Sequence, residues 1–259
     1  MKLRILPASR GIQWVRQGIQ TFFRQPLALT GLFFMFLLAM SVLSLVPLIG
    51  NVLALALFPG ASLGLMVAAR ETNEGRFPMP LVMVSAFRAG RERLQAMLIL
   101  GVLYACGFML VLGCSALFDG GKFASLNLGG GRMTAELVQE ADFQTAMLVA
   151  MALYTLLSLV FWHAPALVHW QGVAPVKSLF FSFVACIRNF WAFAVYGVVW
   201  IFLFLFLSII SLTLAAMLGG PEALGVILYP VVIFLVTMFF TSIYFTFVDS
   251  FEITPGDQS

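Results

Sequence analysis

The sequence predicts an all-α integral membrane protein, a polytopic bundle of about six transmembrane helices. Of the 259 residues, 62% are hydrophobic and only 10% are charged, which leaves too little charge for a water-facing exterior. The apolar residues gather in long runs, and about 20 such residues form a helix that crosses the hydrocarbon of a bilayer. Lipid is therefore the expected solvent, and residues 1–259 are expected to form a single integral membrane domain.

Each apolar run predicts one span. The predicted spans cover 27–46, 52–69, 94–117, 143–162, 190–217 and 224–248. The turn-forming residues Pro47 and Gly50 separate the first two spans, so we expect a tight hairpin there. A polar, glycine-broken loop over 118–142 separates the third and fourth spans, and a short turn over 219–221 separates the last two.

Three amphipathic segments precede the hairpins, and we interpret them as interfacial helices at the membrane surface. In the first segment, Ile12, Val15 and Ile19 share one helical face, opposite several glutamines and arginines. The three segments cover 9–25, 80–93 and 175–188. Each leads directly into a span, so the chain order is that of three repeats, each an interfacial helix plus a two-span hairpin. A few matched residues, such as Gly101 with Gly197, favour this repeat.

The distribution of basic residues predicts the orientation in the membrane. Twelve of the 14 lysines and arginines precede the first span or lie in the segments 70–93 and 177–188, and only Lys122 and Arg132 lie on the other side. Cytoplasmic segments of membrane proteins are rich in Lys and Arg. We therefore expect a multi-pass protein of the bacterial inner (cytoplasmic) membrane. Its N-terminus and its tail over 249–259 are expected in the cytoplasm, and the loop over 118–142 on the opposite side.

The basic residues of the amphipathic segments are the candidate contacts for lipid headgroups. They are Arg16, Arg24, Arg88, Arg91, Arg93, Lys177 and Arg188. Each such charge is worth about 1 kcal/mol near an anionic membrane surface. The alternative is that these residues only fix the topology. The expected partners are membrane lipids, with other inner-membrane proteins or a second copy of the chain as further candidates, and no nucleic acid.

Small residues in the second span predict a close helix contact. Gly60, Gly64 and Ala68 lie four residues apart and form one small-residue ladder. We favour packing within the chain over homodimerisation. Pro59, just before the ladder, has two interpretations: an unwound span of the kind that lines substrate sites in transporters, or simply a bent helix.

No catalytic residue, cofactor site or metal site is predicted. The spans hold almost no ionisable residues, which argues against an ion-coupled carrier. His163 and His169 are six residues apart, not the four that place two metal ligands on one helical face, and they fit an interfacial belt beside two tryptophans. A lipid-modifying enzyme would have to use these histidines together with Lys177 and Arg188.

Several stretches of the chain resemble known proteins. These stretches are LRILPASRGIQWVRQGIQTFFRQPLALTGLFF, SLVPLIGN, LFPGASLGLMVAAR and FVACIRNFWAFAVYGVVW. They resemble an uncharacterised family of multi-pass inner-membrane proteins from proteobacteria. More distantly, the units of helix plus hairpin are similar to the membrane domain found with some glycerophosphodiester phosphodiesterases. That domain anchors a separate catalytic barrel, for which this chain has no room, so the resemblance implies location and topology and transfers no catalytic residue.

These observations together favour a multi-pass inner-membrane protein that is not an enzyme and needs no cofactor. We expect it to act through lipid and protein contacts, as a scaffold or an envelope-maintenance factor. The alternative is a permease, or the membrane subunit of a transporter, for a neutral or amphipathic substrate.

Overall fold

The computed structural model describes residues 2–46, 49–129 and 132–252. Six helices in this part of the chain are long and apolar enough to cross a membrane. They are α2 (Pro26–Ser44), α3 (Gly50–Asn73), α5 (Arg91–Asp119), α8 (Ala141–Phe161) with its continuation α9 (Ala164–Gln171), α11 (Phe190–Leu218) and α12 (Pro221–Ser250). The predicted all-α, polytopic class is confirmed.

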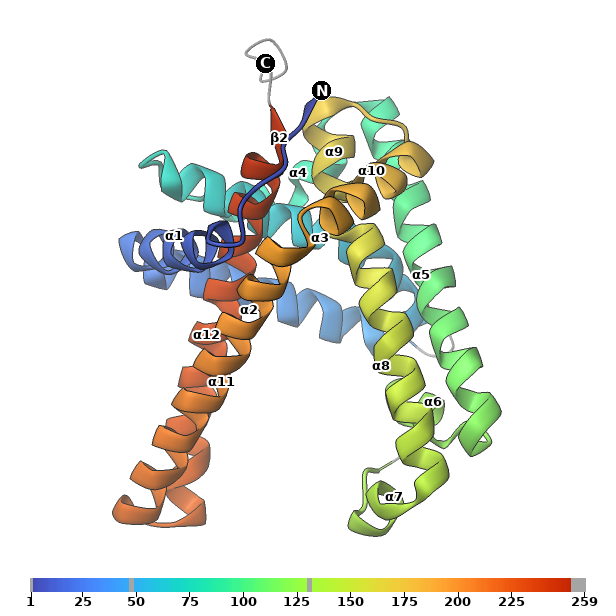
Figure 1. The fold of residues 1–259 in the computed structure, drawn as a ribbon, viewed down its shortest axis with the longest axis vertical. Coiled ribbons are helices and arrows are strands. Elements are labelled where there is room, and N and C mark those ends of the chain that lie inside the picture. Colours follow the sequence, from blue (N-terminus) through green and yellow to red (C-terminus); the bar gives the residue numbers. More distant parts are fainter. Residues whose placement is uncertain (1, 47–48, 130–131, 253–259) are drawn as a thin grey trace. The chain divides into compact units, whose positions relative to one another are not determined.

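Shorter elements precede, connect and follow the spans (Figure 1). They are β1 (Lys2–Leu3), α1 (Arg10–Arg24), the 3₁₀ helix η1 (Pro80–Val84), α4 (Ser85–Arg88), α6 (Lys122–Asn127), α7 (Ala135–Gln139), α10 (Pro175–Arg188) and β2 (Phe251–Glu252). The segment 80–93 is therefore not one interfacial helix. Gly90 has a φ of 100°, a conformation that interrupts the helical path between α4 and α5.

The contacts of the chain divide it into two compact units, where the sequence suggested one domain. The first unit comprises Met1–Leu38, Ala61–Ala89 and Val184–Ser259, and the second comprises Ala39–Gly60 and Gly90–Phe183. Three sequence predictions concern residues outside the described part of the chain: Pro47 in the first turn, positions 130–131 of the glycine-rich loop, and 253–259 of the tail.

The first unit is built on α1, which packs against both α11 and α12. Two glycines make this approach possible. A Cβ atom at Gly18 would lie 2.3 Å from Cβ of Ser242, and one at Gly11 would lie 2.3 Å from the carbonyl oxygen of Ala192. Since no side chain fits at either position, α1 lies with its backbone directly against the two long helices.

Aromatic rings fill the core of the first unit. The ring centroid of the buried Trp14 lies 5.1 Å from that of Phe193 and 6.0 Å from that of Tyr196. On α2, the ring of Phe33 lies 5.7 Å from that of Phe240 on α12. Such ring pairs add stabilisation beyond the area that they bury, so they tie α1 and α2 to the hairpin of α11 and α12.

The second unit is built on the packing of α5 against α8, with the first part of α3 beside α5. A Cβ atom at Gly101 would lie only 1.9 Å from the carbonyl oxygen of Ala56. Three residues after Gly101, the ring of Tyr104 stacks on that of Phe58, with 5.2 Å between the ring centroids. The same ring packs edge-to-face with that of Phe161, at a centroid distance of 5.1 Å.

Pro59 does not unwind its span. The helix α3 runs without interruption from Gly50 to Asn73, with the buried Pro59 inside it. Proline lacks the N–H that would bond to the preceding turn, but a transmembrane helix tolerates it where neighbouring groups fill the gap. The interpretation of this region as an unwound helix is therefore wrong.

Candidate functional site

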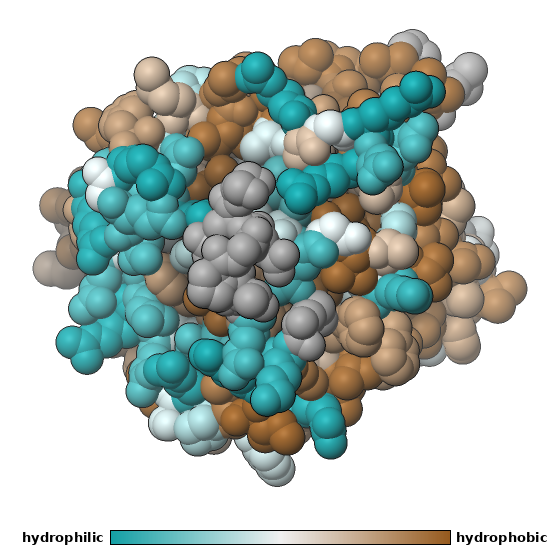
Figure 2. Space-filling view, turned by 90° about the horizontal axis from the view of Figure 1, so that it is seen from above, coloured by the Kyte–Doolittle hydropathy of each residue, from teal (hydrophilic) through white to brown (hydrophobic). Residues whose placement is uncertain are grey.

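The candidate headgroup contacts carry charges that no described residue balances. Six of the seven side chains are exposed and Arg93 is half-buried. Within residues 2–46, 49–129 and 132–252, none of the seven forms an ion pair. Arg24 donates from Nη1 to the carbonyl oxygen of Asn73 at 2.7 Å, which is a neutral partner. Hydrophilic residues gather among hydrophobic ones on the face seen in Figure 2.

Five other basic side chains are paired with carboxylates. The pairs are Arg4 with Glu252, Arg10 with Asp249, Arg70 and Arg76 with Glu74, and Lys122 with Glu140. Burial raises the pKa of Glu74, but its hydrogen bonds to the two arginines and their charges outweigh this effect and hold the pKa below its usual value. The residues selected from the sequence thus differ from their paired neighbours in that their charge is free to act on a ligand.

The helix α10 exposes a mixed apolar and basic face. Val176 and Phe180 are 70% and 63% exposed, beside the exposed Lys177, whereas Ser178 and Ser182 are buried. The Oγ of Ser182 accepts a hydrogen bond from the N–H of His163 at 2.9 Å and donates a hydrogen bond to a carbonyl oxygen of α8 at 3.0 Å. It satisfies backbone groups that the end of α8 leaves free.

The helix α1 buries one face in the protein instead of laying its apolar face on the membrane. Its buried residues are Gly11, Trp14, Val15, Gly18, Thr21 and Phe22. Ile12 and Phe23 remain exposed, on the same helix as Arg16 and Arg24. The signal missed in the sequence was the pair of glycines seven residues apart on the side of Trp14, a spacing that favours close helix contact.

The N-terminal segment is fastened to the far end of the chain. The indole N–H of Trp14 donates to Oδ2 of Asp249 at 2.8 Å, and Nε of Arg10 lies 3.3 Å from the same oxygen. Asn189 is buried and accepts from the N–H of Leu6 at 2.8 Å. The strands β1 and β2 pair in antiparallel register, so the first and last described segments lie side by side. We call these contacts the terminal anchor.

The histidine group, which comprises His163, His169, Lys177 and Arg188, does not form a polar site. The side chain of His163 is buried and that of His169 is half-buried, while Lys177 and Arg188 are exposed. Burial raises the pKa of Cys186 to about 12, so its thiol stays protonated. In the described ranges, no three His, Cys, Asp or Glu side chains lie together as ligands for a metal ion.

The small-residue ladder of α3 is buried along its whole length. Gly60, Gly64 and Ala68 are all buried, and a Cβ atom at Gly64 would lie 2.7 Å from Cα of Met83. The contact partner of Gly64 is thus the η1 segment of the same chain.

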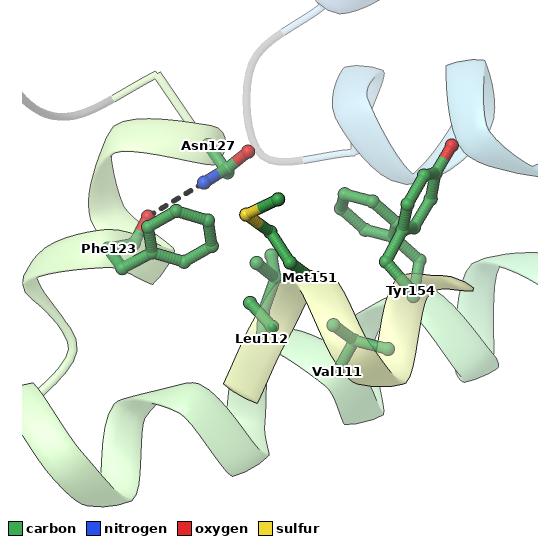
Figure 3. A pocket seen from close by; sticks show the side chains of 8 residues that line it. Val111, Leu112, Phe123, Asn127, Met151 and Tyr154 are labelled. Atoms are coloured by element: carbon green, nitrogen blue, oxygen red, sulfur yellow. Dashed lines mark hydrogen bonds between the residues drawn. The ribbon is translucent and has the colours of Figure 1, made fainter. Parts of the chain in front are cut away.

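An apolar pocket lies in the second unit between α5, α6 and α8, and no sequence pattern predicted it (Figure 3). Its volume is about 230 Å³. The lining residues are Phe108, Val111, Leu112, Phe123, Asn127, Ala150, Met151 and Tyr154. The short helix α6, which was predicted as loop, places Phe123 and Asn127 at the pocket.

Comparison with known proteins identifies the family. The chain is 42% identical over 238 residues to a protein of Burkholderia thailandensis named as a probable inner membrane protein. The alignment covers 91% of this chain and 86% of that protein. The chain belongs to this family of inner membrane proteins. The resemblance to a family of inner-membrane proteins is thereby confirmed. No protein-family model and no solved structure matches the chain.

For a multi-pass inner membrane protein, exposed apolar side chains on the spans face hydrocarbon. Leu110 on α5, which is 69% exposed, is an example. Phe180 and Val176 differ, because they lie on α10, outside the six spans and beside a lysine. Apart from the spans, two features stand out: the mixed apolar and basic face of α10 and the apolar pocket of the second unit.

Proposed function

We propose that this inner membrane protein is a non-enzymatic scaffold that binds anionic lipid headgroups, and through lipid and protein contacts serves envelope maintenance. The observation that carries the proposal is the set of seven basic side chains without a carboxylate partner in the described part of the chain. Guanidinium groups bind phosphate oxygens in a two-pronged geometry, which makes arginine well suited to phospholipid headgroups.

Exposed apolar side chains beside these charges support the same proposal. Phe23 lies next to Arg24, and Phe180 lies one helical turn from Lys177. At a membrane surface the aromatic ring enters the acyl boundary while the charged group stays at the headgroups, so both contacts add to binding. A segment that only fixed topology would need the charges but not the exposed rings.

The proposed orientation places both ends in the cytoplasm. The pairing of β1 with β2 supports this proposal, because it holds the first and last described segments side by side, as two ends on one side of a membrane would be. Twelve of the 14 lysines and arginines lie in the segments assigned to that side from the sequence. The anionic inner surface of a cytoplasmic membrane would then face the basic helices.

Native mass spectrometry of the purified protein tests the headgroup proposal. The triple variant Arg16→Gln, Arg24→Gln and Arg188→Gln should retain phosphatidylglycerol more than about tenfold more weakly than the wild type, because each removed charge is worth about 1 kcal/mol. Its retention of zwitterionic phosphatidylethanolamine should change little. Added salt should weaken the binding of phosphatidylglycerol to the wild type.

A matched control removes charge from the opposite side of the protein. The double variant Lys122→Gln with Arg132→Gln should keep the phosphatidylglycerol preference of the wild type. If the triple variant and this control retain the lipid equally well, the seven residues only set topology and the proposal fails.

The alternative function is a permease, or a transporter subunit, for a neutral or amphipathic substrate. The six spans and the apolar pocket favour this reading over that of an ion-coupled carrier. Substrate-dependent flux in liposomes that contain only this protein would replace the scaffold proposal. The distant likeness to the membrane domain found with glycerophosphodiester phosphodiesterases remains a prediction and adds no residue to either function.

The absence of enzymatic activity is also part of the proposal. The buried His163 leaves the histidine group without a shared polar face on which a lipid could react. Cells that carry the variant with His163→Ala and His169→Ala should show the lipid composition of wild-type cells. A lipid that accumulates specifically in the variant would indicate a lipid-modifying enzyme.

A further inference from the structure

The pocket of the second unit has an apolar lining. Its walls are aliphatic and aromatic carbon, supplied by residues such as Phe108, Leu112 and Met151. The side-chain N–H of Asn127 donates to the carbonyl oxygen of Phe123 at 2.9 Å, as the dashed line in Figure 3 shows. The hydroxyl of Tyr154 lies 3.5 Å from that of Tyr104. A cavity with such walls stays free of water and accepts hydrocarbon.

The mouth of the pocket opens at the surface of the transmembrane helix α8. Met151 and Tyr154 line the pocket and are 59% and 40% exposed. Met151 lies ten residues after Ala141, the first residue of α8, which is about 15 Å at the rise of an α-helix. The opening therefore lies within the hydrocarbon layer, where a lipid chain is the neighbouring molecule and a water-soluble ligand is not.

We propose that this pocket holds one acyl chain of a membrane phospholipid. The amide of Asn127 stands at the α6 side of the pocket. It lies where the glycerol ester of the lipid would be, at the carboxyl end of the acyl chain. The inference is independent of the basic amphipathic helices, since none of their seven residues lines the pocket.

Photo-crosslinking tests the pocket on the full-length protein in nanodiscs. The probe is a phosphatidylethanolamine that carries a diazirine on one acyl chain, close to the ester. Mass-spectrometric mapping should find adducts on the lining residues Phe108, Leu112 and Phe123, in addition to adducts on lipid-facing side chains such as Leu110. Adducts on Leu110 alone would mean that lipid surrounds the helices without entering the pocket, and would overturn the proposal.

A pocket-filling variant and a matched control sharpen the test. Ala150 is buried in the lining, so Ala150→Phe should abolish the adducts on Phe123 and leave those on Leu110 intact. Leu148→Phe, on the exposed face of the same helix, should leave both sets intact. If Ala150→Phe prevents folding, the smaller Ala150→Leu takes its place. Unchanged adducts on Phe123 in a folded filling variant, or labelling of the lining by a diazirine fatty acid but not by the phospholipid, contradict the proposal.

Discussion

Asp249 is the residue through which α12 holds the N-terminal helix. Its side chain is only 17% exposed and receives both the indole N–H of Trp14 and the guanidinium of Arg10. A buried carboxylate is costly unless it is paired and hydrogen-bonded, and here both conditions are met. The three side chains come from opposite ends of the sequence, so pattern along the chain could not have predicted their contact.

The hydrogen bond between Trp14 and Asp249 should contribute measurably to stability. Trp14→Phe keeps an aromatic ring in the core but removes the only donor of the indole. A hydrogen bond to a charged group is worth about 1.5–3 kcal/mol, so the variant should unfold at a lower temperature than the wild type in the same detergent. The control is Trp191→Phe, because Trp191 is 71% exposed. Equal melting temperatures of the two variants would show that the bond adds nothing.

At the scale of the helix, glycines decide how close two elements come. Of the three glycines of α5, Gly101 lies tightly against the backbone of Ala56 and Gly107 against the side chain of Leu157, whereas Gly113 has no atom within 4 Å of its would-be Cβ. Gly197 on α11, which the sequence paired with Gly101 as a repeat position, also has no such neighbour. The identity of residue type in the proposed repeat therefore does not extend to packing at this position.

Gly101 and Gly113 of α5 allow a matched experiment. Gly101→Ala should destabilise the protein, because a methyl group 1.9 Å from a carbonyl oxygen forces the backbone of α3 to move, and such overpacking costs about 1–3 kcal/mol. Gly113→Ala should leave stability unchanged or raise it by up to about 1 kcal/mol, since alanine favours helix more than glycine. Thermal unfolding in detergent measures both. A similar melting temperature for both variants would refute the close contact.

Helical periodicity predicted the elements better than the faces that they bury. The six spans follow from the length of the apolar runs, and α1 and α10 from their amphipathic spacing. Which side of a span meets protein is not encoded in hydrophobicity, because lipid is as apolar as a protein core. On α5, for example, Leu100 is buried and its neighbour Ile99 is 50% exposed. The pocket could not be predicted for a related reason, since six of its eight lining residues are ordinary span sequence and the other two lie on α6, which was predicted as loop.

On the scale of the whole molecule, the pairing of the chain ends constrains the topology. An even number of spans returns the chain to its starting side, and the antiparallel pairing of Lys2–Leu3 with Phe251–Glu252 requires the same result. The even count and the pairing are independent observations, one from hydropathy and one from the backbone. The assignment of that side to the cytoplasm is proposed from the basic residues, because cytoplasmic segments are rich in Lys and Arg.

Cysteine labelling should establish the side. The native Cys106 and Cys114 are exposed on α5 and Cys186 is buried, so all three are first replaced by serine or alanine. A membrane-impermeant maleimide added to intact spheroplasts should then label Ser125→Cys in α6 and fail to label Phe77→Cys. Phe77 is chosen over the nearby Gly75 because it is 61% exposed, whereas Gly75 has a φ of 79° that a cysteine would strain.

The reverse labelling pattern would invert the orientation and would move the basic helices away from the cytoplasmic leaflet. The headgroup proposal would then lose the anionic surface that it requires, whereas the acyl-chain pocket would be unaffected, because it opens to hydrocarbon on either orientation. Labelling of both cysteines in disrupted cells confirms that each is present and reactive. A protected Ser125→Cys together with a protected Phe77→Cys in intact spheroplasts would contradict the placement of α6 beyond the end of a span.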